Sequence, residues 1–107
     1  MSALNPAPIF AALGDATRLG LLARLNDGQS RSINTLTSSS PLTRQAVTKH
    51  LHVLEQAGLV HSQRTGRETQ YTLRPDAITA ARDYLNEVSQ QWDMALDRLK
   101  EFIERQA

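Results

Sequence analysis

Apolar residues near the end of the chain recur in an unbroken heptad register. They step by three and four residues, at Ile78, Ala81, Leu85, Val88, Trp92, Ala95, Leu99 and Phe102. This spacing keeps one face of an α-helix apolar, and it predicts a helix over about residues 76–105 that is roughly 40–50 Å long. A domain of 107 residues does not need so long a helix for its own core. Part of this stripe must therefore pair with another surface, most simply with a second copy of the chain.

Residues 41–60 predict a capped amphipathic helix that ends directly at a strand. Thr43 is a favourable N-cap residue, and Gly58 is the residue type that most easily adopts the left-handed conformation after a helix. Val47, Leu51 and Leu54 have the i, i+4, i+7 spacing of a core-facing stripe. We therefore expect a helix over about residues 43–57.

The opposite face of this helix is polar and has no acidic residue before Glu55. Its side chains are Arg44, Gln45, Thr48, Lys49, His52 and Gln56. Side chains of these types read base edges in the DNA major groove or bind phosphates. A solvated face of an ordinary surface helix explains the same pattern equally well, so the neighbouring segments must decide.

The residues before this helix complete a helix-turn-helix pattern. A short helix is expected over residues 6–13, and a second one, capped by Asp15, extends to Asn26. Residues 30–32 can form a minimal strand, and a short helix follows around residues 33–36. Residues 38–41 are too few for a linker between domains and therefore form the turn. Arg18, in the first turn of the second helix, is equally compatible with a phosphate contact and with a solvated surface position.

A β-hairpin is predicted over about residues 59–73. Its flanks alternate with period two, and a polar turn containing Gly66 separates them. The tip presents Arg64 and Arg67, beside a helix that is also basic. Since an isolated hairpin is unstable, this one must pack on the helices. A basic hairpin next to a basic helix favours DNA over solvent as their common partner.

The charges are distributed unevenly along the chain. Residues 1–74 contain eight Lys or Arg and four Asp or Glu, whereas residues 75–107 contain four and seven, which gives the net charge of +1. The first part therefore suits an anionic partner. The chain has no cysteine, no apolar run of membrane-spanning length and no signal peptide pattern at its start. We expect no disulfide, no membrane segment and a cytoplasmic location.

The expected fold class is mainly α with a small β-hairpin, arranged as one winged helix-turn-helix domain over residues 1–107 with a long C-terminal dimerisation helix. The segments ALGDATRLGLLARL, TRQAVTKHLHVLEQAGLV and GRETQYTL carry a closer resemblance. With them the chain resembles the ArsR/SmtB family of dimeric bacterial transcription regulators. The final WDMALDRLK resembles a subgroup whose last helix extends the dimer interface.

The resemblance implies roles for individual side chains. Gln45, Thr48 and Lys49 would face the major groove, and Arg67 would reach the adjacent minor groove or backbone. The full set expected at DNA is Thr43, Arg44, Gln45, Thr48, Lys49, His52, Arg64 and Arg67. The set expected at the dimer interface is Ile9, Phe10, Leu85, Val88, Trp92, Ala95, Leu99 and Phe102.

The metal sites of the family have no counterpart in this sequence. Where metal sensors carry a Cys-x-Cys pair, residues 33–37 hold no ligand, and the last helix contains aspartates but no histidine. His52 and His61 lack evident carboxylate partners for zinc. His50 falls beside the apolar stripe of its helix, and we interpret it as structural. We therefore expect no metal and no cofactor.

Three functional classes remain to be compared. The leading hypothesis is a homodimeric, sequence-specific regulator, a repressor whose two recognition helices, roughly 34 Å apart, read an inverted repeat in double-stranded DNA. The alternative is a protein-interaction module that uses the C-terminal stripe, which predicts a monomer with negligible DNA affinity. An enzyme is disfavoured because no nucleophile arrangement, phosphate loop or paired carboxylates occur. An unidentified effector could enter between the last helices near Trp92.

Overall fold

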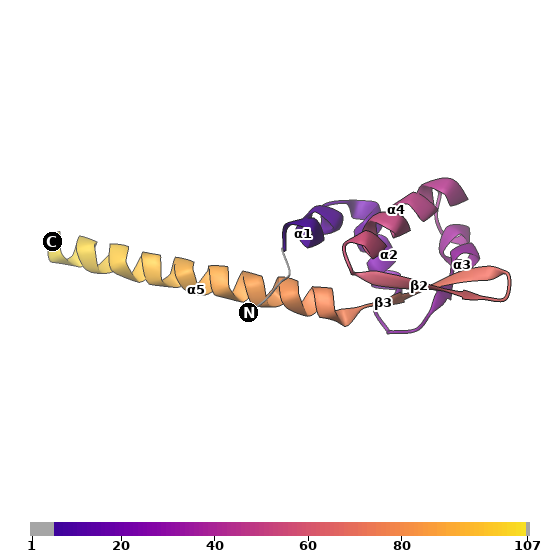
Figure 1. Ribbon diagram of the computed structural model, residues 1–107. Coiled ribbons are helices and arrows are strands. Elements are labelled where there is room, and N and C mark those ends of the chain that lie inside the picture. The colour runs from indigo at the N-terminus through magenta and orange to yellow at the C-terminus, as the bar shows by residue number, and fades with distance from the viewer. Residues whose placement is uncertain (1–5, 107) are drawn as a thin grey trace.

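The computed structural model describes residues 6–106 and has a winged helix-turn-helix architecture (Figure 1). The elements follow in the order α1 (Ala7–Leu13), α2 (Ala16–Arg24), β1 (Arg31–Ser32), α3 (Ile33–Ser38), α4 (Arg44–Gln56), β2 (Val60–Thr65), β3 (Glu68–Leu73) and α5 (Pro75–Gln106). Helices α3 and α4 form the helix-turn-helix, and β2 with β3 forms the wing. The predicted fold class is confirmed.

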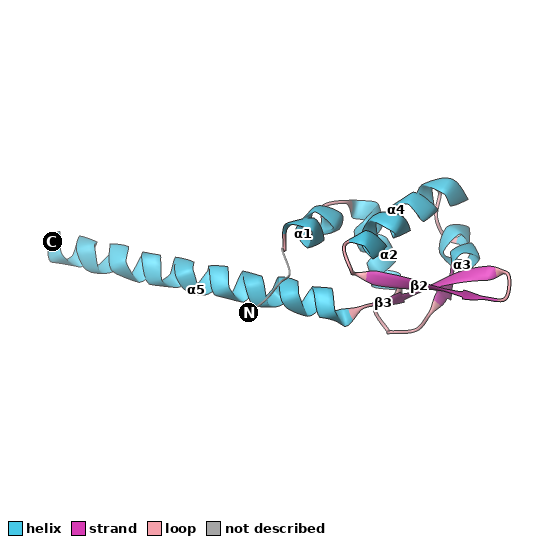
Figure 2. Cartoon of the chain, viewed as in Figure 1, coloured by secondary structure: helices cyan, strands magenta, loops and turns pink. Residues whose placement is uncertain are grey.

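The short strand β1 joins the wing in a three-stranded antiparallel sheet. The strand order is β1-β3-β2, with Arg31 opposite Tyr71 and Val60 opposite Leu73. Figure 2 shows the two long strands of the wing, β2 and β3, in magenta. The sequence predicted at most a minimal strand here, and nothing in it indicated that β1 pairs with the far strand of the hairpin. This pairing ties the start of α3 directly to the wing.

Local capping sets the ends of the helices that carry the motif. The Thr43 hydroxyl accepts a hydrogen bond from the Ala46 amide at 3.1 Å, and the Asp15 carboxylate accepts one from the Arg18 amide at 3.0 Å. Each cap satisfies an amide that has no partner within its helix. At the end of α4, Gly58 has φ +79°, and the following Leu59 amide bonds back to the Leu54 carbonyl at 2.9 Å. This glycine turn directs the chain from α4 straight into β2.

One hydrophobic core lies beneath α4 and the sheet. The predicted stripe of α4, Val47, Leu51 and Leu54, is fully buried at 0% exposure. It packs with side chains from the other four helices and from β2 and β3, and with the loop residues Leu25 and Leu59; the cluster includes Leu36, Val60 and Tyr71. Burial of each such leucine contributes about 1.5–3 kcal/mol. The apolar face of α4 is thus fixed, and its polar face is turned outward.

Helix α5 projects away from this core. Its buried residues are Ala77 and Ala81, and all its described residues after Ala81 are partly or largely exposed. The radius of gyration is 19.1 Å, compared with about 13 Å for a compact chain of this length. Figure 1 shows the second half of α5 extending free of the other elements. Despite this length, none of the described helices is apolar enough to traverse a lipid bilayer.

Candidate nucleic-acid interface

The outer face of α4 forms a shallow depression, which we call the reading surface. It is lined by Thr43, Gln45, Ala46, Thr48, Lys49 and His52. The polar side chains predicted on this face, together with Arg44, are all exposed, and the stripe on the opposite side of the same helix is buried. The structure therefore brings the predicted helical residues together on one accessible surface. Their contact with DNA stays a prediction.

Two hydroxyl groups of the reading surface are partly used within the protein. The Thr48 hydroxyl donates to the Arg44 carbonyl at 2.7 Å, so its oxygen can still accept a hydrogen bond but its hydrogen is used. The Thr43 hydroxyl acts as the helix cap through a lone pair, so its hydrogen remains free to donate to a phosphate. The amide of Gln45 and the ammonium of Lys49 are consequently the groups best suited to read base edges.

Arg44 is held in place by residues that no sequence pattern singled out. Its guanidinium donates to the Asn34 side-chain carbonyl, and the Asn34 amide donates to the Glu68 carboxylate at 2.6 Å. This chain of contacts links the first turn of α4 to α3 and to the start of β3. A guanidinium has five N–H donors, so others remain available for a phosphate. Nothing in local periodicity connects positions 34, 44 and 68.

The two arginines of the wing lie at its tip, Arg64 near the end of β2 and Arg67 in the turn that connects β2 to β3. Thr65 pairs with Glu68, and the two residues between them form a loop with positive φ at Gly66 alone, the pattern of a type II′ hairpin. Arg64 and Arg67 are both exposed. The Glu55 carboxylate of α4 accepts hydrogen bonds from the Ser62 amide at 3.2 Å and hydroxyl at 2.7 Å. The wing is therefore anchored to the helix that carries the reading surface.

The position of Arg18 corrects both interpretations of that residue. Its Nε donates to the Ala12 carbonyl at 2.7 Å, and its Nη2 donates to the Ala11 carbonyl at 3.4 Å. The side chain is therefore neither free in solvent nor turned toward a phosphate, because it satisfies the last carbonyls of α1. Its Nη1 lies 3.3 Å from Nδ1 of His50, which is half-buried beside the stripe as expected.

The residues expected at a dimer interface differ in exposure. Leu85, Trp92, Leu99 and Phe102 are 53–65% exposed, while Val88 and Ala95 are half-buried. Phe10 is half-buried and packs its ring against Tyr84 of the same chain, with 5.7 Å between centroids. Ile9 is only 3% exposed because its side chain belongs to the protomer's own core. It therefore has almost no surface left for a partner, and the interface prediction for Ile9 needs correction.

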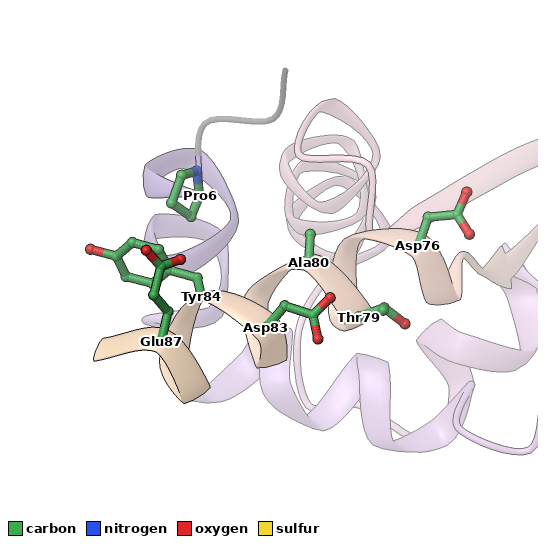
Figure 3. A pocket seen from close by; sticks show the side chains of 7 residues that line it. All are labelled: Pro6, Asp76, Thr79, Ala80, Asp83, Tyr84 and Glu87. Atoms are coloured by element: carbon green, nitrogen blue, oxygen red, sulfur yellow. The ribbon is translucent and has the colours of Figure 1, made fainter. Parts of the chain in front are cut away.

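A pocket between the start of α1 and the first turns of α5 is acidic, whereas the reading surface contains no acidic side chain. Figure 3 shows the residues that line the pocket, which are Pro6 and, along the first turns of α5, Asp76, Thr79, Ala80, Asp83, Tyr84 and Glu87. Three carboxylates make this region unfavourable for phosphates. In the described residues 6–106, no group of three His, Cys, Asp or Glu side chains is arranged to hold a metal ion.

Comparisons with known proteins agree with this geometry. A helix-turn-helix domain family model matches residues 13–63. The HTH-type transcriptional regulator Rv2034 of Mycobacterium tuberculosis is 32% identical over 100 residues, which cover 94% of this chain and 90% of that protein. A homodimeric winged helix-turn-helix DNA-binding domain from Mycobacterium bovis shares the fold, with a TM-score of 0.63 at 21% identity over 79% of this chain and 78% of that one.

The ArsR-like transcriptional regulator from Rhodococcus sp. RHA1 is similar in both sequence and structure. It is 35% identical, has a TM-score of 0.79, and the match covers 91% of each chain. The similarity therefore includes the helix-turn-helix, the wing and most of the long last helix. The chain belongs to the ArsR family of helix-turn-helix transcriptional regulators.

Proposed function

We propose that the protein is a homodimer that represses transcription by occupying an inverted-repeat operator in double-stranded DNA. The observation that carries this proposal is the reading surface, whose polar side chains are exposed on α4 directly opposite a stripe at 0% exposure. A helix fixed in this way presents its hydrogen-bonding groups at a defined angle. Base readout needs such a rigid support.

Each protomer would place the N-terminal half of α4 in the major groove. Gln45 can make a bidentate contact with adenine, and Lys49 can donate to guanine or to a phosphate. The exposed wing arginines, Arg64 and Arg67, would contact the flanking backbone or minor groove. Because these contacts neutralise phosphates, we expect operator affinity to fall steeply as salt increases.

Pairing of two chains along α5 would supply the second reading surface. Four large side chains of the stripe are more than half exposed, which supports a quaternary role for this face. The Mycobacterium bovis domain of the same fold is homodimeric, which supports pairing of two chains. A twofold dimer reads half-sites one helical turn apart, roughly 34 Å, which explains why the operator would be an inverted repeat.

The test is an anisotropy titration with duplex DNA selected from a randomised library. Lys49→Ala and Gln45→Ala should each weaken binding by about 1–3 kcal/mol while light scattering still finds a dimer. Lys100→Ala removes the same charge from exposed α5 and serves as the matched control. Unchanged binding by both reading-surface variants would refute the assignment. A monomer without duplex affinity would instead support the interaction-module alternative.

Repression itself is tested with a reporter gene behind the selected operator. Deletion of the regulator should raise reporter expression, because an unoccupied promoter becomes accessible to polymerase. A fall in expression would mean that the protein activates transcription through the same binding surface.

A further inference from the structure

Asn34, in the first turn of α3, links the helix that carries the reading surface to the wing. Helix α3 lies between the start of α4 and the wing in Figure 1, and it packs against both α4 and β3. The Asn34 side-chain oxygen accepts a hydrogen bond from Nη1 of Arg44, the first residue of α4. The Asn34 side-chain amide donates to the carboxylate of Glu68, the first residue of β3, at 2.6 Å. One short side chain thus joins three elements at the edge of the reading surface.

The two neighbours allow the Asn34 amide only one hydrogen-bonded orientation. A guanidinium only donates hydrogen bonds and a carboxylate accepts them, so the amide oxygen must face Arg44 and the amide nitrogen must face Glu68. A reversed amide would place donor against donor and acceptor against acceptor. Glu68 therefore fixes the side chain of Asn34, and Asn34 in turn fixes the guanidinium of Arg44.

The backbone holds the start of α3 beside β3 independently of the Asn34 side chain. Ser32 caps α3 by accepting a hydrogen bond from the Thr35 amide at 3.1 Å, and it also pairs with Gln70 of β3. The start of α3 therefore keeps its place beside the wing when the Asn34 side chain is truncated. A variant at position 34 consequently tests the side-chain contacts and not the position of the helix.

Arg44 is the member of this set that is suited to bind a phosphate. It is exposed beside Thr43, which lines the reading surface, and its guanidinium has further N–H donors. A free arginine side chain loses rotamer freedom when it binds a phosphate, and this loss opposes binding. A guanidinium that Asn34 already holds has lost part of that freedom before DNA arrives. Its contact with a phosphate is therefore more favourable than that of a free arginine.

We infer that Asn34 is a positioning residue, which holds the Arg44 guanidinium in the orientation that binds an operator phosphate. This inference rests on the proposed function. Asn34 and Arg44 are exposed and Glu68 is half-buried, so water competes with their hydrogen bonds in the free protein. DNA that covers this region removes the water and strengthens the same hydrogen bonds. We therefore expect Asn34 to contribute more to operator binding than to the stability of the fold.

The test is a double-mutant cycle in the anisotropy titration at constant salt. Arg44→Ala should weaken operator binding about tenfold, because a charge-assisted hydrogen bond is lost. Asn34→Ala should weaken it about fivefold, the effect of one long side chain that must be ordered on binding. The double variant should bind within about twofold of Arg44→Ala alone, since Asn34 acts through Arg44. A loss of about fiftyfold, the product of the two single effects, overturns the inference, as does unchanged binding by Arg44→Ala.

Lys49 supplies the matched control, because it lines the reading surface on the same helix and has no hydrogen bond to Asn34 in the described structure. The effects of Asn34→Ala and Lys49→Ala should multiply, whereas those of Asn34→Ala and Arg44→Ala should not. Coupling of equal size at Lys49 would mean that Asn34 places α4 as a whole, and it would overturn the positioning role. The urea midpoint of Asn34→Ala should match that of the wild type.

NMR of the free protein gives a readout that needs no DNA. The resonances of the Asn34 side-chain amide should shift in both Glu68→Ala and Arg44→Ala, because each variant removes one of its two partners. Unchanged resonances in either variant overturn the inference. If the wild type binds the selected operator and the effects in the cycle multiply, the inference alone fails. If the wild type binds no duplex, the proposed function fails with it.

Discussion

The exposure of large apolar side chains differs between two regions of the molecule: the body, which comprises α1 to β3 and the first turns of α5, and the projecting half of α5. In the body, Leu36, Leu51 and Leu59 are at 0% exposure, whereas in α5 Trp92, Leu99 and Phe102 are at 53–65%. Large apolar side chains are thus buried in the core of the body but exposed to solvent on the projecting half of α5. The body therefore has its core within one chain, whereas the large side chains of the α5 stripe stay exposed in that chain, as expected of a surface that binds a partner.

The polar contacts differ in the same way. Side chains in the body join separate elements, as Glu55 does with Ser62 and Arg24 with the Leu36 carbonyl. Within the described part of α5, side-chain hydrogen bonds and ion pairs are local, such as that between Arg82 and Asp83 at 3.7 Å. In the described structure, the polar side chains in the projecting half of α5 make no hydrogen bond or ion pair with the other elements. They are therefore available for contacts with a partner.

The largest expected effect is the loss of the dimer in Trp92→Asp. If the stripe pairs two chains, each dimer would bury two unpaired carboxylates, and the dimer dissociation constant should rise about 100-fold or more. Size exclusion with light scattering measures the change. Gln90→Asp adds the same charge on the opposite face of α5 and should remain dimeric. Equal behaviour of the two variants would show that the stripe is not the interface.

Leu51→Ala tests the contribution of the buried core, in contrast to the exposed stripe of α5. Leu51 is fully buried in the body, so truncation should lower the free energy of unfolding by about 2–5 kcal/mol in urea denaturation. In the Trp92→Asp background, where pairing is removed, Leu99→Ala should cost less than about 1 kcal/mol. Similar losses at both positions would mean that α5 packs on its own body.

The features predicted correctly from sequence are those fixed by neighbours within one element. The buried stripe of α4 follows from i, i+4 and i+7 spacing, and the length of α5 follows from the heptad register. The cap at Thr43 and the turn at Gly58 depend on a few adjacent residues. In each case the physical cause lies within one continuous segment of the chain, so the sequence contains it.

What the sequence did not predict depends on how separate elements pack against one another. Whether Arg18 meets solvent, phosphate or a carbonyl depends on where α1 ends in space. The contact of Arg44 with Asn34 depends on the packing of α3 against α4. For Ile9, α1 has only seven residues, too few for periodicity to separate a core face from an interface face. The roles of such residues follow from tertiary structure.

The smallest expected effect is on the free energy of unfolding at acidic pH. It tests whether the Asp15 cap, at the junction of α1 and α2, contributes to the loss of stability in acid. The Arg18 amide, first among several causes, holds the pKa of Asp15 below its ordinary value of 3.8. The folded state therefore binds the proton less readily than the unfolded chain does. The stabilisation from this carboxylate is complete above pH 3.8 and is lost as pH falls through the lower folded-state pKa.

Asp15→Asn keeps an N-cap acceptor but cannot titrate. In the Trp92→Asp background, unfolding measured between about pH 5 and pH 2.5 should depend less on pH in the Asp15→Asn variant than in the parent. Asp15→Ala, which removes the cap, should be less stable than both at neutral pH. If the parent and Asp15→Asn lose stability at the same rate, acid acts elsewhere in the body. The cap would then stabilise α2 through its hydrogen bond alone, without a contribution from its charge.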